Sequence, residues 1–182
     1  AEVILSNNLV FGPGRFDGGG LFVIGRDGTD FRRLSMTVKE FRARNDYVYR
    51  GLSFARRIPG NEEEIIASGN MTASDSTDLY RLNLRTGRYT LITQGRPADR
   101  TGRWLMDDKL VPRVVSASIK DTLTTVVYYR KDEKSDWYEI ARYEGNKGPI
   151  FVPLAINSKD GSLQVAYNGN RDTVGVYHYD PI

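Results

Sequence analysis

The feature that most constrains the fold of this chain is a five-residue pattern that returns at a fixed distance. Residues 20–24, 78–82 and 136–140 each carry an aromatic residue in third place and an aliphatic residue in fifth place, and successive copies start 58 residues apart (20 to 78, 78 to 136). A fourth copy, residues 175–179, starts 39 residues after the third (136 to 175). Self-similarity of this kind is the signature of a repeat architecture, so the chain is predicted to fold as successive similar units.

Each copy of the pattern reads as a β-strand, because its apolar residues alternate with a period of two. A turn signal rich in glycine and polar residues follows each of the first three copies, and a second short run returns after it at residues 31–34, 89–92 and 150–154. We therefore predict an antiparallel hairpin in each of these repeats. Further strands are predicted at residues 64–68, 102–106, 113–118, 122–130 and 162–167. No segment keeps a 3.6-residue period for long enough to predict a helix.

Repeats of roughly 40 to 60 residues with four short strands each predict a β-propeller. The expected fold class is all-β, a partial β-propeller of about four antiparallel four-stranded blades. We treat residues 1–182 as a single propeller segment, with repeats at roughly 1–58, 59–116 and 117–155 and an incomplete one at 156–182. A two-sheet β-sandwich is the rival architecture, but it predicts no fixed offset. The recurring aromatic residues are expected to pack between adjacent blades, in preference to forming a sugar-stacking platform: Phe22, Tyr80, Tyr138 and Tyr177.

Charge and composition argue against several classes of function. The net charge is +3, and the arginine-rich residues 31–57 are followed by the acidic residues 58–80. This alternation favours solvated strand faces over a nucleic-acid interface, which would gather basic and aromatic residues on one surface. No apolar run approaches the roughly 20 residues of a membrane span, and residues 1–10 lack the pattern of a signal peptide. The missing initiator methionine indicates a processed or excised product, and the absence of cysteine excludes disulfides while leaving the compartment open.

Two residues, Ser53 and His178, are candidates for a hydrolytic site. Residues 51–55 come nearest to a nucleophile elbow, but Ala55 stands where the second glycine is needed, so Ser53 is interpreted as a strand serine. His178 is the single histidine, and the sequence supplies no partners for a triad or a zinc site around it. It is interpreted as an outward-facing strand residue. We therefore predict no catalytic residue in this chain.

Clusters of acidic residues and of glycines are candidates for binding sites. Residues 62–64, three glutamates, are interpreted as a solvated turn before a strand in preference to an amine or metal site. Residues 27–30 and 75–78 resemble fragments of calcium loops, but they lack the alternating oxygen ligands and final glutamate, and they predict hairpin turns. Residues 12–14 and 18–20 are interpreted as loop, because no helix follows them to complete a phosphate cradle. No cofactor-binding or metal-binding residue is predicted.

Three stretches of the chain resemble a known family of propellers. The run of residues 78–93 resembles the blade pattern of TolB-like and prolyl oligopeptidase-type propellers. Residues 151–154, 160–165 and 172–180 look like a later blade. Between them lie residues that resemble a middle blade of the propeller preceding the hydrolase domain in prolyl oligopeptidase-family serine peptidases: Trp104, Asp107, Arg113, the strand 124–130 and the run 137–140. The resemblance covers about residues 20–182.

The resemblance implies a propeller that caps an α/β-hydrolase domain and limits access to its Ser-Asp-His site, so that peptides are cleaved in preference to folded proteins. The hydrolase domain is expected outside this chain, and the implied partner is a peptide substrate reached through that domain. A TolB-like protein-binding module without catalysis is the alternative. A carbohydrate-active propeller is a third reading, which needs convergent carboxylates. An incomplete ring also exposes the flanks of its end blades, which predicts self-association, most simply as a homodimer.

Overall fold

The computed structural model describes residues 2–6, 19–25, 27–44, 48–145, 148–169 and 171–182. Almost all of its regular structure is β, in strands β1 to β14 with one short helix, α1. The chain divides into two compact units, Ala1–Gln94 and Gly95–Ile182. No helix among the described residues is long and apolar enough to cross a membrane.

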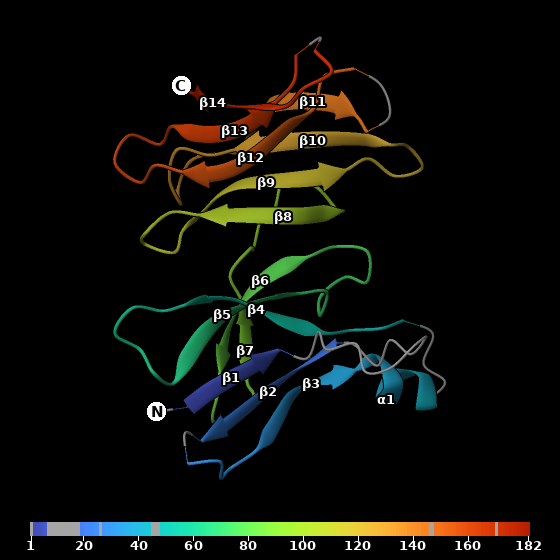
Figure 1. Cartoon of the computed structure of the whole chain (residues 1–182), viewed down its shortest axis with the longest axis vertical. Coiled ribbons are helices and arrows are strands. Elements are labelled where there is room, and N and C mark those ends of the chain that lie inside the picture. Colours follow the sequence, from blue (N-terminus) through green and yellow to red (C-terminus); the bar gives the residue numbers. More distant parts are fainter. Residues whose placement is uncertain (1, 7–18, 26, 45–47, 146–147, 170) are drawn as a thin grey trace. The chain divides into compact units, whose positions relative to one another are not determined.

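The unit Ala1–Gln94 contains two antiparallel sheets, and in each of them the strands follow chain order (Figure 1). The three-stranded sheet consists of β1 (Glu2–Ser6), β2 (Gly19–Gly25) and β3 (Arg32–Thr37). The four-stranded sheet consists of β4 (Leu52–Arg57), β5 (Glu64–Gly69), β6 (Asp78–Asn83) and β7 (Tyr89–Leu91). The apolar residues of the two sheets meet in one core, in which Leu21 of β2 joins Leu52, Ile65, Tyr80 and Leu82.

The helix α1 (Val38–Ala43) was not predicted, because six residues are too few to show a helical period. A local signal for it is nevertheless present in the sequence. The Thr37 hydroxyl accepts a hydrogen bond from the Glu40 N–H (3.2 Å), and the Glu40 carboxylate accepts one from the Thr37 N–H (2.9 Å). This reciprocal pair is a capping box, which needs only threonine followed three residues later by glutamate.

The unit Gly95–Ile182 also contains a four-stranded and a three-stranded antiparallel sheet, but in the reverse order along the chain. Its four-stranded sheet consists of β8 (Thr101–Met106), β9 (Pro112–Ser118), β10 (Thr124–Tyr129) and β11 (Tyr138–Glu144). Its three-stranded sheet consists of β12 (Phe151–Ile156), β13 (Leu163–Tyr167) and β14 (Gly175–Tyr179). The two sheets share a core of Val114, Val127, Tyr129, Leu163 and Val165. The prediction of an all-β, antiparallel chain is therefore confirmed, and none of the described sheets is closed.

Two of the three predicted hairpins form, and the third prediction is wrong. β2 pairs with β3 and β6 pairs with β7, as expected. The run 136–140 was expected to pair with 150–154, but β11 pairs with β10, and β12 pairs with β13. The turn between β11 and β12 thus connects two sheets. A glycine-rich turn signal does not itself distinguish a hairpin from a link between sheets.

The fixed offset therefore equates strands that occupy different places in their sheets. β6 is an interior strand, whereas β11 and β14 are edge strands. Tyr80 on β6 is 1% exposed, but Tyr138 on β11 is 40% exposed and Tyr177 on β14 is 41% exposed. The recurring aromatic residues were predicted to pack between adjacent blades. Tyr138 and Tyr177 are only partly covered, since an edge strand has a neighbour on one side only, although the Tyr138 hydroxyl donates to the Pro181 carbonyl just after β14 (2.7 Å).

The boundaries of the sheets also differ from the boundaries of the predicted repeats. The boundary expected near residues 58 and 59 falls between the paired strands β4 and β5, and the boundary near 116 and 117 falls inside β9. An offset fixes the period of a repeat, but it leaves the starting point of each unit undetermined.

The different burial of the two tyrosines predicts different losses of stability. We expect Tyr80→Ala to cost about 3 kcal/mol, since it removes a buried ring and a hydroxyl that accepts a hydrogen bond from the Thr72 N–H (3.0 Å). Tyr138→Ala should cost less than half as much. Urea denaturation followed by circular dichroism compares the two variants, and equal losses would contradict the placement of β6 and β11.

Candidate functional site

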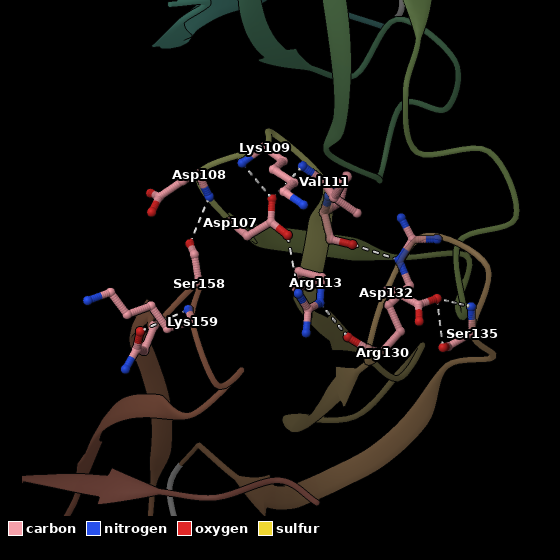
Figure 2. A network of polar contacts seen from close by, with 12 residues as sticks. Asp107, Asp108, Lys109, Val111, Arg113, Arg130, Asp132, Ser135, Ser158 and Lys159 are labelled. Carbon is pink, nitrogen blue, oxygen red and sulfur yellow. Dashed lines mark hydrogen bonds and ion pairs between the residues drawn. The ribbon is translucent and has the colours of Figure 1, made fainter.

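A buried polar network lies where β8 turns into β9 and where β10 ends (Figure 2). Arg113 on β9 is 8% exposed, and its guanidinium has three partners. Its Nε donates to the main-chain carbonyl of Arg130 (2.8 Å), one terminal nitrogen donates to Asp107 Oδ2 (3.2 Å), and the other donates to the Tyr129 hydroxyl (2.9 Å). We call Asp107, Arg113, Tyr129 and Arg130 the arginine network. A guanidinium charge that is buried to this extent requires a full set of hydrogen-bond partners.

Asp107 organises the turn between β8 and β9 as well as pairing with Arg113. Its Oδ1 accepts hydrogen bonds from the N–H groups of Lys109 and Val111, both at 3.0 Å. Within this turn Leu110 has φ of +64°, a left-handed conformation that is costly for a branched side chain. The carboxylate thus stabilises a turn that the leucine alone would disfavour, and both of its oxygens are engaged.

The guanidinium of Arg130 also donates hydrogen bonds to main-chain carbonyls, as the Nε of Arg113 does. Its Nε donates to the main-chain carbonyl of Pro112 (2.7 Å), and a terminal nitrogen donates to the carbonyl of Glu133 (3.2 Å). Its guanidinium also lies 4.6 Å from the centre of the Trp137 ring, within cation–π range. Burial lowers the pKa of Arg130, while the Glu133 carboxylate acts in the opposite direction. The two arginine side chains therefore hold β9 against the end of β10, because Arg113 bonds the carbonyl of Arg130 and Arg130 bonds the carbonyl of Pro112.

The network also meets the second sheet of the same unit. The N–H of Asp108 donates to the hydroxyl of Ser158, which lies in the turn between β12 and β13 (2.8 Å; Figure 2). In that turn Gly161 has φ of +82°, and a Cβ atom placed on it would lie 2.5 Å from the Tyr129 hydroxyl and 3.3 Å from the Arg113 guanidinium. A side chain at this position would collide with the network. The arginine network thus forms part of the seam between the two sheets.

The chemistry open to this arrangement is limited. Arg113 donates through all three of its guanidinium nitrogens, and both oxygens of Asp107 accept. A general base needs a free lone pair facing a substrate, and a nucleophile needs a base beside it. Neither condition is met by the partners observed here. The network stabilises the fold and positions the loops around it.

The sequence resemblance had singled out four residues of this region, and the structure brings them together. Asp107 pairs with Arg113, while Trp137 contacts Trp104 edge to face with ring centres 5.8 Å apart. Sequence reasoning missed the roles of Tyr129 and Arg130. The available signal was an arginine at the end of an apolar strand, since a cation in such a run must find buried partners.

A second feature of this unit is an aromatic cavity of about 630 Å³ beside the three-stranded sheet. Phe151 is its central ring, with ring centres 5.0 Å from Tyr179 and 6.3 Å from Tyr167. His178 lines this cavity on the exposed strand β14. The cavity lies within the size range of small-molecule pockets, and its rings suit an apolar group. This cavity could not be predicted from the sequence, because its walls come from four separate strands, β11 to β14, and from the segments that connect them.

Ser53 lies on β4, opposite Ser68 of β5, as expected for a strand serine. It lines a shallow polar pocket of about 510 Å³ in the unit Ala1–Gln94, together with Asn70, Asp75 and Thr77. Asn70 shapes this pocket by accepting a hydrogen bond from the Gly51 N–H (2.8 Å) and donating to the Tyr49 carbonyl (2.7 Å). No strand-to-helix elbow surrounds the serine. The pocket offers hydroxyl groups and the Asp75 carboxylate, and no histidine is among the residues that line it.

The acidic clusters are placed as turns and strand ends. Glu64 begins β5 and pairs with Arg81 (3.5 Å), while Glu62 and Glu63 are exposed in the preceding turn. Asp27 accepts hydrogen bonds from the Thr29 hydroxyl and N–H, which lower the pKa of its carboxyl. Among the described residues, no group of three or more histidine, cysteine, aspartate or glutamate side chains could hold a metal ion. Residues 27–30 lie between the paired strands β2 and β3, and residues 75–77 lie between the paired strands β5 and β6, so the prediction of hairpin turns is confirmed.

The structure describes the segment 75–78 in full but only part of the glycine-rich runs. Asp78 is fully buried at the start of β6 and accepts a hydrogen bond from the Thr93 hydroxyl (2.8 Å). Gly20 belongs to β2 with φ of +87°. Residues 12–14 and Gly18 lie outside the described residues.

No significant match to this chain was found among protein families, curated proteins or solved structures.

Loss of the Arg113 guanidinium should be costly. We expect Arg113→Met, which keeps most of the side-chain volume, to destabilise the unit Gly95–Ile182 by about 3 kcal/mol, because it leaves buried partners unpaired. Tyr129→Phe is the milder comparison, with a loss of about 1 kcal/mol. Both tryptophans lie in this unit, so tryptophan fluorescence during urea denaturation follows its unfolding. A loss for Arg113→Met no larger than for Tyr129→Phe would show that the network does not hold the strands.

The close packing at the turn between β12 and β13 predicts that two glycine substitutions differ in their cost to stability. Gly161 and Gly148 both have positive φ, +82° and +76°, but a Cβ atom on Gly148 would meet nothing within 4 Å. Gly148→Ala should therefore cost only the backbone strain, roughly 1 kcal/mol. Gly161→Ala should cost clearly more, since the methyl group also displaces the Tyr129 hydroxyl. The same fluorescence measurement compares the two, and equal costs would remove the evidence for close packing at this turn.

Proposed function

We propose that this chain is the propeller portion of a prolyl oligopeptidase-like serine hydrolase, which limits the substrates that reach a catalytic domain elsewhere in the same protein. The main support is the succession of separate antiparallel sheets along the chain, each with its strands in chain order. Successive blades of a propeller have this arrangement. Two of the described sheets have four strands and two have three, and we interpret the three-stranded sheets as incomplete blades.

The arginine network gives a second line of support. It is built from residues that carry the resemblance to a middle blade, and it lies in the turn between two strands of one sheet and beside the next sheet. A propeller that acts as a filter must keep its blades rigid, because its selectivity depends on the width of the passage that they leave. Peptides would pass to the hydrolase domain while folded proteins would be held back by size.

A TolB-like protein-binding module is the second candidate. The aromatic cavity beside the three-stranded sheet favours it, because such a cavity could receive an apolar side chain from a partner protein. In that case the chain would bind without any chemistry, and no hydrolase domain would be needed. The coding sequence of the whole protein separates the two candidates.

The first experiment examines the complete gene product. A propeller that serves a serine hydrolase should be encoded together with a Gly-x-Ser-x-Gly elbow followed by aspartate and histidine. The full product should then react with a fluorophosphonate probe, at a serine outside these 182 residues. A reading frame without such an elbow, or a product that the probe does not label, would overturn the proposal and leave the binding module.

The second experiment uses the 182-residue chain alone. We expect no turnover of p-nitrophenyl acetate above a matched Ser53→Ala variant, because Ser53 lies within a strand and not in a strand-to-helix elbow, and no histidine lines its pocket. Turnover that disappears in the Ser53→Ala variant would show that the chain itself carries a nucleophile.

A further inference from the structure

The turn that follows β13 contains an asparagine directly before a glycine, Asn168 and Gly169. The Arg171 N–H donates to the main-chain carbonyl of Asn168 (2.9 Å), which closes the turn, and Gly169 has φ of +55°. The side chain of Asn168 is held by its oxygen, because Oδ1 accepts a hydrogen bond from the Ile150 N–H (2.8 Å). The side-chain nitrogen, Nδ2, has no hydrogen-bond partner among the residues that the structure describes.

An asparagine carries an electrophilic carbon, Cγ, and the main-chain nitrogen of the next residue can attack it to close a five-membered ring. The rate of such an intramolecular reaction depends on how freely the two atoms approach each other. Glycine has no Cβ atom to obstruct the approach. The Gly169 N–H has no acceptor among the described residues, so no hydrogen bond within that part of the chain restrains its nitrogen. We infer that Asn168 is a site of spontaneous deamidation in the folded protein.

The reaction consumes water and needs no other reactant. The Gly169 nitrogen loses its proton and forms a bond to Cγ of Asn168, and the Cγ–Nδ2 bond then breaks, so that Nδ2 takes up a proton and leaves as ammonia. Negative charge develops on Oδ1 during the attack, where the Ile150 N–H is already placed to stabilise it. Water then opens the ring. Cleavage at Cγ gives aspartate, and cleavage at the main-chain carbonyl carbon gives isoaspartate.

The other asparagines that the structure describes each lack part of this arrangement. None of them precedes a glycine. Three of them donate a hydrogen bond from Nδ2, which retains the leaving group: Asn61, Asn70 and Asn157. Asn83 precedes Leu84, whose N–H donates to the Glu63 carbonyl (2.8 Å), so the attacking nitrogen is engaged there. Among the described residues, Asn168 is therefore the asparagine expected to react first.

Deamidation would change the aromatic cavity beside the three-stranded sheet. Asn168, Gly169 and Arg171 line this cavity, and its lining residues include no aspartate or glutamate. The reaction places a carboxylate in a wall whose charged side chains are otherwise basic. Arg171 makes a long hydrogen bond to the Tyr177 hydroxyl (3.5 Å), and a carboxylate in the same turn is a stronger acceptor for its guanidinium. The inference does not depend on the proposed hydrolase.

Peptide mapping tests the inference on the folded 182-residue chain. The chain is incubated at mildly alkaline pH, since base promotes loss of the Gly169 proton, and its tryptic peptides are analysed by mass spectrometry. The peptide 160–171 should show an amide converted to a carboxylate at Asn168, in an aspartate and an isoaspartate form, with the Asn168→Asp variant as the reference for the former. The asparagines that should stay unchanged over the same period are Asn61, Asn70, Asn83 and Asn157. An intact amide at Asn168 in the folded chain would overturn the inference, whether or not the same amide is lost in urea.

A substitution at Gly169 tests why this asparagine reacts. A Cβ atom on Gly169 would lie 3.5 Å from the Tyr167 ring, an ordinary contact, so Gly169→Ala can be accommodated. Deamidation should slow at least tenfold, because the methyl group obstructs the approach of the reacting atoms and small displacements cost this much rate or more. Gly60→Ala is the matched control, since Gly60 also has positive φ (+71°) in a turn between paired strands, β4 and β5, and it should leave the rate unchanged. Equal rates in the two variants would contradict the assigned role of Gly169.

Discussion

The charge of Arg113 is the constraint on which the unit Gly95–Ile182 depends. A guanidinium that is 8% exposed is tolerated only when its N–H groups find acceptors, and here each guanidinium nitrogen has one. Those acceptors come from two places: Asp107 in the turn after β8, and the neighbouring residues Tyr129 and Arg130 where β10 ends. Satisfying one cation thus fixes three segments relative to one another. The hydrophobic core supplies most of the stabilisation, and the network selects the geometry in which that core is built.

The same network determines what surrounds it. Gly161 lies so close to Tyr129 that only a glycine fits, and Ser158 receives the N–H of Asp108. The three-stranded sheet is therefore attached to the four-stranded one by a turn, while its far edge, β14, is left unpaired in the described structure. A packed turn at one side of the sheet and an unpaired strand at the other suit an element that is repeated along a chain, as in the propeller that we propose.

Much of the strand content could be predicted from the sequence, because alternation of apolar residues is a local property. β5, β9, β10 and β13 lie within about two residues of the predicted segments. Pairing between strands is not local, and there the prediction was wrong: β11 and β12 face different partners although a glycine turn joins them. The arginine network shows the same limit. Asp107 and Arg113 could be selected by their resemblance to a blade. The role of Tyr129 depends instead on the turn that contains Gly161, which comes 32 residues later in the chain (129 to 161) and packs against the Tyr129 hydroxyl.

The most direct test of the account is amide hydrogen exchange at Val111, whose N–H donates to Asp107 Oδ1. If the arginine network is the constraint that holds this unit, that turn opens only when the unit unfolds, and the amide exchanges with the free energy of unfolding measured by tryptophan fluorescence. The exposed turn between β9 and β10 gives the comparison, through the N–H of Thr122, which donates to the Ile119 carbonyl (3.3 Å). Slow exchange at Val111 and fast exchange at Thr122 are predicted. Exchange at Val111 as fast as at Thr122 would contradict the account.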